Sequence, residues 1–291
     1  MSSGQRRTER TFGFRTRALH AGGIPDATTG ARAVPIYQTT SFVFQDTADA
    51  ASLFALQKYG NIYSRIGNPT VAALEERIAS LEGGIGAVAT SSGMSAEFIT
   101  FAALAGAGDH VVASASLYGG TYNLLHHRFA RLGIDVTFID DADDVAAWEA
   151  AVRPSTKALY GESIGNPRGD VLDIEGVAAV AHRHGLPLIV DNTLASPYLL
   201  RPLEWGADVV IHSATKFLGG HGTVIAGLIV DGGKFPWSQH VDKFPGLTEP
   251  DPSYHGASYT GVLGDGIAYV IKASVQLLRD TGAALSPDSA F

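Results

Sequence analysis

Short, uniformly apolar runs alternate with longer segments of helical spacing along most of this chain, and that alternation constrains the fold more than any other feature. The apolar runs lie at 87–90, 110–113, 136–139, 158–160, 188–190 and 209–211. The helical patterns lie at 94–105, 122–132, 145–152, 174–184 and 267–279. Short apolar strands separated by helices indicate a mostly parallel sheet that is buried on both faces. We therefore predict an α/β fold with helices on both faces of the sheet.

The first well-defined helix of the sequence begins after Asn68. Asn68 is a favourable N-cap, Pro69 suits the first helical position, and apolar side chains then repeat at helical spacing until Gly83. We predict a helix over 68–82. Residues 1–67 lack such a pattern and contain only short apolar runs, so they are predicted to form an arm and not a domain of their own.

Composition and charge exclude several kinds of partner. The chain has 291 residues with 21 basic and 29 acidic side chains, a net charge of -8, and no feature that favours nucleic acid or an anionic membrane. Cys is absent, which excludes disulfides and thiolate zinc sites. The histidines at 126–127 and 182–184 suit solvated or hydrogen-bonded roles, so no metal site is predicted. The first ten residues are polar and no long apolar run follows, so we expect a cytoplasmic protein whose partners are small molecules or other subunits.

Lys216 stands out within the segment VVIHSATKFLGGHG at 209–222. It follows a buried strand, with Ser213 and Thr215 before it, and therefore lies at the edge of the sheet where ligands bind. An imine-forming amine must lose its proton, which apolar walls favour. A surface lysine at a strand end is the alternative, and it would be the default for a lysine without these neighbours.

Three further signals fall at the same edge of the sheet. Asp191 ends a buried strand and needs a cationic or hydrogen-bonding partner, such as the protonated ring nitrogen of pyridoxal phosphate, although it could instead cap the next turn. The segment 91–94 opens a helix whose N–H groups could bind a phosphate, although Ser92 could be an ordinary N-cap. Tyr118 could lie on a flat cofactor, or it could be a buried core side chain.

These residues resemble the pyridoxal-phosphate enzymes of cysteine and methionine metabolism, a group that includes cystathionine synthases and lyases, methionine γ-lyase and the sulfhydrylases. The resemblance extends from about Arg15 onward, and the run S-A-T-K-F-L-G-G-H-G is highly specific to the group. It implies the pyridoxal-phosphate-dependent transferase fold, of the aminotransferase type I kind, with a seven-stranded sheet. It also implies pyridoxal 5'-phosphate linked to Lys216, phosphate contacts from Ser213, Thr215, Gly93 and Met94, Tyr118 on the ring, Asp191 at the ring nitrogen and Asn166 near the ring hydroxyl. Lys216 and Tyr118 are the implied catalytic residues.

The resemblance also implies how the chain is organised. Tyr63-Ser64-Arg65 is similar to a Y-S-R motif in which Tyr63 and Arg65 would reach the phosphate bound by a neighbouring subunit, giving a homodimer within a tetramer. The implied division is an arm for subunit contacts over 1–67, a large cofactor-binding domain over 68–264, and the start of a C-terminal domain over 265–291. The rest of that C-terminal domain, which supplies an arginine for the substrate carboxylate, is expected to be missing from a truncated chain.

Within the family, residues 249–256 are most similar to O-acetylhomoserine sulfhydrylase, and Gly120 stands where methionine γ-lyases usually carry Cys. The implied reaction replaces the acetate of O-acetyl-L-homoserine with sulfide, which gives L-homocysteine and acetate. With methanethiol in place of sulfide, the products are methionine and acetate. The reaction belongs to methionine biosynthesis by sulfhydrylation. The alternatives are a cystathionine γ-synthase or γ-lyase, and a cofactor-binding fragment with impaired catalysis.

Overall fold

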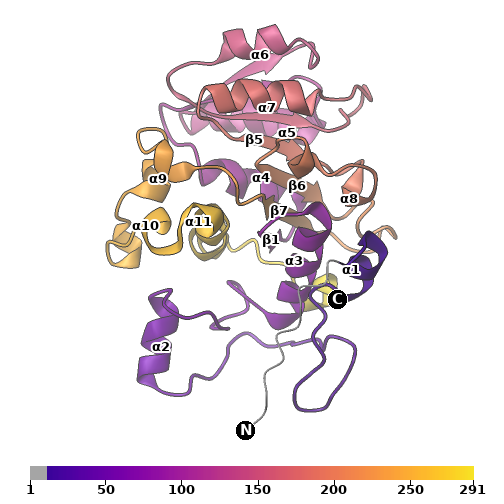
Figure 1. Ribbon diagram of the computed structural model, residues 1–291, viewed down its shortest axis with the longest axis vertical. Helices are drawn as coiled ribbons and strands as arrows, with labels where there is room; N and C mark the ends of the chain where they lie inside the picture. The colour runs from indigo at the N-terminus through magenta and orange to yellow at the C-terminus, as the bar shows by residue number, and fades with distance from the viewer. Residues whose placement is uncertain (1–11) are drawn as a thin grey trace.

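A single seven-stranded sheet runs through the protein, whose computed structural model describes residues 12–291 (Figure 1). The strand order is β1-β7-β6-β5-β4-β2-β3. Strands β2 to β6 pair in parallel, and β7 runs antiparallel to both of its neighbours. The strands are β1 (Gly86–Thr90), β2 (His110–Ser114), β3 (Asp135–Ile139), β4 (Thr156–Glu162), β5 (Leu188–Asp191), β6 (Val209–Ser213) and β7 (Gly227–Asp231).

The six predicted strands are confirmed, and β7 is the strand that the sequence analysis missed. Its core, Leu228 to Val230, is a short apolar run, which is the pattern that identified the other six. All five residues of β7 are buried because the strand lies between β1 and β6 with helices on both faces. The sheet is therefore mostly parallel, as predicted, with one antiparallel strand.

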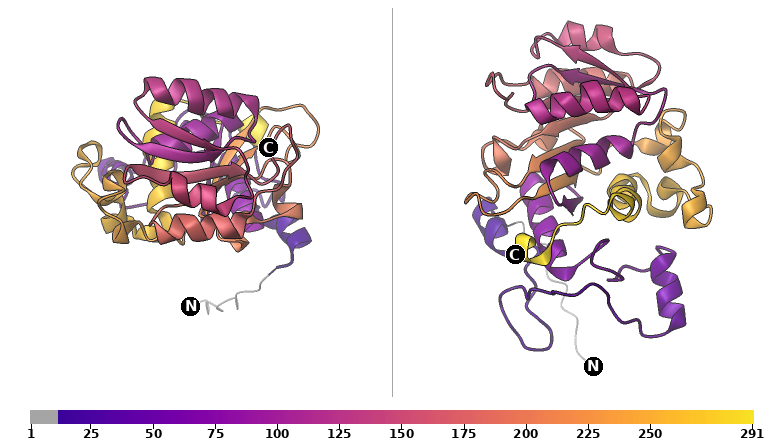
Figure 2. Two further views of the ribbon diagram at one scale, coloured as in Figure 1. Left: turned by 90° about the horizontal axis from the view of Figure 1, so that it is seen from above. Right: turned by 180° about the vertical axis from the view of Figure 1, so that it is seen from behind.

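Helices cover both faces of the sheet and create two separate hydrophobic cores (Figures 1 and 2). One face carries α4 (Gly93–Ala102), the π-helix η1 (Leu124–Phe129), α11 (Asp265–Lys272) and the π-helix η5 (Ala273–Leu278). The other face carries α3 (Pro69–Glu82), α6 (Val145–Ala151) and α7 (Ile174–Arg183). Burial of large side chains such as Phe101, Phe129 and Trp148 stabilises this arrangement by about 2 to 3 kcal/mol for each side chain.

Helix α3 begins and ends where the sequence indicates. The Asn68 side chain accepts a hydrogen bond from the backbone N–H of Thr70 at 3.0 Å, and Pro69 occupies the first helical position. The helix ends at Gly83, whose φ of 84° lies in the left-handed region that favours glycine. The prediction of a helix over 68–82 is confirmed.

Two other predicted helices differ in their limits. The segment predicted as 122–132 begins earlier, as α5 (Gly119–Asn123), and continues into η1. The segment predicted as 267–279 runs from α11 through η5 into α12 (Arg279–Thr281). Shorter helices fill the remaining connections: α8 (Ser196–Leu199), η2 (Pro202–Glu204), η3 (Trp237–Gln239), α9 (Pro245–Thr248), η4 (Pro252–Tyr254), α10 (Tyr259–Leu263) and α13 (Pro287–Ala290).

The arm contains two short helices that the sequence analysis did not predict, α1 (Phe14–His20) and α2 (Thr47–Phe54). Among residues 12–67 only Leu53 is buried, and the assignment of residues 1–67 as an arm stays a prediction. Figure 2 shows α2 standing away from the sheet. The polar first ten residues lie outside the described residues.

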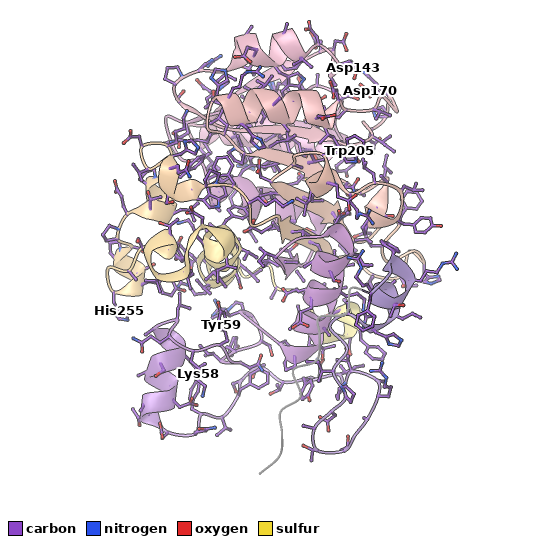
Figure 3. All side chains as sticks on the ribbon, viewed as in Figure 1. Lys58, Tyr59, Asp143, Asp170, Trp205 and His255 are labelled. Atoms are coloured by element: carbon purple, nitrogen blue, oxygen red, sulfur yellow. The ribbon has the colours of Figure 1, made fainter. Side chains whose placement is uncertain are left out.

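Beyond α2, the arm approaches the segment around η4. Lys58 and Tyr59 lie on one side of a groove and His255 on the other (Figure 3). The groove has a volume of about 350 Å³. Helix α11, by contrast, packs against β1 and β7 and shares the core of the large sheet, so the predicted domain boundary at residue 264 stays a prediction.

Over residues 12–291, none of the helices combines the length and the apolar character needed to cross a membrane.

Candidate active site

A cavity of about 670 Å³ lies beyond the carboxyl ends of β4, β5 and β6, next to the N-terminus of α4. This is the place where parallel α/β sheets bind ligands. The cavity brings together most of the residues that the sequence analysis singled out. They are Gly93, Met94, Tyr118, Asn166, Asp191, Ser213, Thr215 and Lys216.

Lys216 projects from a turn that starts where β6 ends. Its backbone N–H donates to the carbonyl of Ser213 at 3.1 Å, and its side chain is exposed in the cavity wall. The hydroxyl of Thr215 accepts the N–H of Ala226 at 3.0 Å and donates to the carbonyl of the same residue at 3.2 Å. Both hydrogen bonds tie the turn to the residue that precedes β7. They therefore hold the backbone of the turn that carries Lys216 in place.

Asp191, the last residue of β5, is 8% exposed. Its Oδ1 accepts the backbone N–H of Thr193 at 2.8 Å, and the Thr193 hydroxyl accepts the N–H of Ser213 at 2.7 Å. Asp191 therefore does cap the next turn, which was the alternative interpretation. Within residues 12–291 no hydrogen bond reaches its Oδ2, and burial raises the pKa of the carboxyl. One oxygen stays available for a cation in the cavity.

Helix α4 begins at the cavity with unusually close packing against β6. A Cβ atom on Gly93 would lie 2.7 Å from the Cβ of Ser213, so only glycine permits this approach. The hydroxyl of Ser92 accepts the N–H of Ser95 at 3.1 Å, which makes Ser92 the N-cap. The N–H groups of Gly93 and Met94 have no partner within the helix and are suited to an anion such as phosphate.

Tyr118 is 52% exposed, which excludes the alternative of a buried core side chain. Its backbone N–H donates to Oε1 of Glu162. Its ring lies against Gly120, where an added Cβ atom would come within 2.4 Å of the ring carbon Cε1. A cysteine at position 120 would therefore require the ring to move.

Two buried glutamates in the cavity wall were missed by the sequence analysis. Glu97 lies one helical turn after Gly93, and Glu162 is the last residue of β4. Burial raises the pKa of each carboxyl to about 8, and the nearby Asp191 adds to both shifts. The position of Glu162 at the end of a buried strand matches that of Asp191 and could have identified it, whereas the packing around Glu97 has no local signal.

These two glutamates should make the stability of the protein depend on pH. The pKa of each glutamate is near 4.5 in the unfolded chain and about 8 in the folded protein. Between pH 4.5 and pH 8 the unfolded chain therefore binds fewer protons than the folded protein. The free energy of unfolding is expected to fall with rising pH, by about 1.4 kcal/mol per pH unit for each group. Urea denaturation at several pH values measures this slope. The double variant Glu97→Gln and Glu162→Gln should show a flatter slope, and an unchanged slope would contradict the assignment.

Tyr63 and Arg65 do not line this cavity. The guanidinium of Arg65 donates to the carbonyl of Arg279 and lies 5.6 Å from the centre of the Tyr63 ring. Both side chains are exposed. Their predicted role concerns a neighbouring subunit and stays a prediction.

The sequence profile of the Cys/Met metabolism PLP-dependent enzymes matches residues 15–291. The chain belongs to this family. It is 54% identical over 289 residues to the O-acetyl-L-homoserine sulfhydrylase of Leptospira meyeri, covering 97% of this chain and 65% of that protein. The chain thus spans about two thirds of the length of that relative.

Two solved structures are similar to this member of the family. An O-acetylhomoserine (thiol)-lyase from Campylobacter jejuni subsp. jejuni, which carries N'-pyridoxyl-lysine-5'-monophosphate, has a TM-score of 0.92 at 38% identity. The match covers 96% of this chain and 68% of that one. A cystathionine γ-lyase from Lactobacillus plantarum in complex with L-serine has a TM-score of 0.75 at 36% identity, covering 96% of this chain and 61% of that one. The α/β fold of this family is thereby established for the chain.

Proposed function

We propose that this protein binds pyridoxal 5'-phosphate at Lys216 and replaces the acetate of O-acetyl-L-homoserine with sulfide, giving L-homocysteine, or with methanethiol, giving methionine. The observation that carries the proposal is the convergence, in one cavity, of an exposed lysine, a buried carboxyl and a helix N-terminus. These groups suit the aldehyde, the ring nitrogen and the phosphate of that cofactor. The names of the relatives support the same chemistry.

Each residue would have a defined task in holding the cofactor. Ser213, Thr215 and the N–H groups of Gly93 and Met94 would bind the phosphate, Tyr118 would stack on the ring, and Asn166 would lie near the ring hydroxyl. Asp191 would hold the proton on the ring nitrogen through its free Oδ2. The bound cofactor supplies an electron sink for charge that develops on the substrate.

Lys216 would then move protons on the substrate. Its amine, released when substrate binds, would take the proton from Cα and transfer protons at Cβ. The Cγ–O bond breaks as acetate leaves, and hydrosulfide forms the new Cγ–S bond, so atoms and charge balance. Apolar side chains at the cavity mouth, Phe217 and Ile225, would limit the access of water to these steps.

The arm is proposed to complete the site of a neighbouring copy, in a homodimer within a tetramer. It exposes large apolar side chains that a second subunit could cover, including Val43 at 99% and Tyr59 at 74% exposure. Tyr63 and Arg65 would contact the neighbour's phosphate. We also propose a division into an arm to residue 67, a large domain to 264 and the start of a C-terminal domain. A location in the cytoplasm is proposed from the metabolic activity named for the relatives.

Replacing Arg65 tests the subunit contact. Arg65→Ala is expected to weaken the affinity for pyridoxal phosphate by about tenfold, because a charge-assisted hydrogen bond is lost. Fluorescence titration with the cofactor measures this change. Arg32→Ala, an exposed arginine of the same arm, is the matched control and should bind as the wild type does. Equal affinities for all three proteins would remove Arg65 from the site.

A cystathionine γ-synthase or γ-lyase is the alternative within the family. The close contact between Tyr118 and Gly120 disfavours the cysteine-bearing site of methionine γ-lyases, and the sulfhydrylase-type structure superposes better than the γ-lyase at similar identity. A cofactor-binding fragment with impaired turnover is the alternative of another class, since the chain covers only 65% of the Leptospira protein.

A single experiment separates these functions. Absorbance spectra are recorded with pyridoxal phosphate before and after addition of O-acetyl-L-homoserine and sulfide, and homocysteine is assayed. A visible band together with homocysteine supports the sulfhydrylase, whereas a band without product supports the impaired fragment. Product from O-succinylhomoserine or methionine in place of O-acetylhomoserine would support the synthase or the lyase. The absence of a band would contradict cofactor binding.

A further inference from the structure

Glu97 is a buried acid that the proposed chemistry does not use. It lies on α4 in the wall of the cavity and is 3% exposed. Its Oε1 accepts a hydrogen bond from the hydroxyl of Thr121 at 2.7 Å, and the Tyr160 hydroxyl lies 3.5 Å away. Its Oε2 is buried, and no partner for it exists among residues 12–291. A charged carboxylate with an unpaired oxygen in such a place would be costly.

The surroundings of Glu97 are acidic. The titratable side chains that face it are Tyr160 and Glu162 from β4 and Asp191 from β5. Lys216 is the one cationic side chain in the described wall of the cavity. Three carboxyls cannot all be ionised in a buried space with a single cation, so protons must remain on some of them. Burial and Asp191 together raise the pKa of Glu97 to about 8.

Glu97 also connects α4 to the element that carries Tyr118. Its partner Thr121 is fully buried and lies on α5, which starts directly after Tyr118. Glu162 accepts a hydrogen bond from the backbone N–H of Tyr118. The aromatic side chain is therefore the exposed end of a segment that two buried glutamates hold in place.

We propose that Glu97 is a positioning residue of the cofactor site: as a neutral acid it fixes Tyr118 through Thr121 and leaves Asp191 as the carboxylate that carries charge at the ring nitrogen. The inference rests on the proposed function, because it presupposes that pyridoxal phosphate occupies the cavity. A second negative charge at Glu97 would compete with Asp191 for the ring proton. The neutral acid avoids this competition and still accepts the Thr121 bond.

Two substitutions at Glu97 separate charge from hydrogen bonding. Glu97→Gln keeps a neutral side chain with a carbonyl oxygen, whereas Glu97→Leu removes both. With the protein loaded with pyridoxal phosphate, Glu97→Gln should keep cofactor affinity within about twofold of wild type, and Glu97→Leu should lose about tenfold. Thr121→Val should lose as much as Glu97→Leu, and the double variant should lose no more than either single one.

The spectrum tests the charge directly. The pH midpoint of the visible band should be the same in the wild type and in Glu97→Gln, because neither carries charge at that position near neutral pH. A midpoint lowered by about one pH unit in Glu97→Gln would show that the wild-type side chain is ionised and would overturn the proposal. Glu76→Gln, the same substitution at an exposed position of α3, is the control.

The remaining outcomes are also decisive. Unchanged affinity in Glu97→Leu and in Thr121→Val would show that the contact does not position Tyr118 and would overturn the inference while leaving the proposed function intact. If Glu97→Leu does not fold, Thr121→Val and the midpoint of Glu97→Gln decide the question. A wild-type protein without a visible band contradicts the proposed function itself, which distinguishes the two failures.

Discussion

Lys216→Ala is expected to abolish the visible absorbance band of the protein loaded with pyridoxal phosphate and to reduce homocysteine formation below detection. Lys216 is the one amine in the described cavity wall, so no other side chain there can form the covalent link. Borohydride reduction followed by mass measurement provides a second readout. The wild type should retain the cofactor mass on the peptide that contains Lys216, and the variant should not.

The control for this variant is Lys234→Ala, which removes an exposed lysine away from this cavity. It should keep the band, the trapped adduct and the activity. A visible band of wild-type intensity in Lys216→Ala, or an adduct on a different lysine, would refute the assignment of Lys216. Weak binding without covalent attachment is compatible with the assignment, because the phosphate and ring contacts remain.

Glu82→Ala is expected to destabilise the fold by about 3 to 5 kcal/mol, because it breaks a fully buried polar pair. Glu82 ends α3, and its Oε1 lies 2.6 Å from Nε2 of His212 on β6. The same oxygen accepts Nδ2 of Asn192 at 3.1 Å, just beyond β5. Loss of this oxygen removes a hydrogen-bond partner from two buried groups, Nε2 of His212 and Nδ2 of Asn192. Urea denaturation of the wild type and the variant measures the difference.

Glu76→Ala, on the exposed side of the same helix, is the matched control and should change stability by less than about 0.5 kcal/mol. Cofactor affinity should also fall in Glu82→Ala, because this network joins the ends of β5 and β6, which carry Asp191 and Ser213. A loss of stability below about 1 kcal/mol would show that the pair does not hold these strand ends together.

Much of the fold could be predicted because its signals are local. The apolar run of β5 and the cap of α3 at Asn68 depend on neighbours within a few residues, so they can be identified without knowledge of the tertiary structure. Strand β7, which was not predicted, has the same kind of short apolar run. The arm was predicted from the absence of a pattern, and the short helices α1 and α2 in it were missed because they bury little beyond Leu53.

Part of the site could be predicted for a similar reason. Lys216 and Asp191 each follow a buried strand, and parallel strands bring their carboxyl ends to one edge of the sheet. The sequence could not decide whether Tyr118 is exposed or buried, because exposure depends on segments that pack around it. The structure decided this by placing its ring against Gly120 in the cavity.

By itself, the sequence determined the alternation of strands and helices, the edge of the sheet at which the candidate site lies, and the lysine motif at that edge. Only the tertiary structure revealed the acids that surround the site. Glu82 and His212 are 130 residues apart, and Glu97 meets Thr121 across two helices. Their protonation and pairing depend on burial, and burial is produced by the packing of distant segments, which no local pattern of residues records.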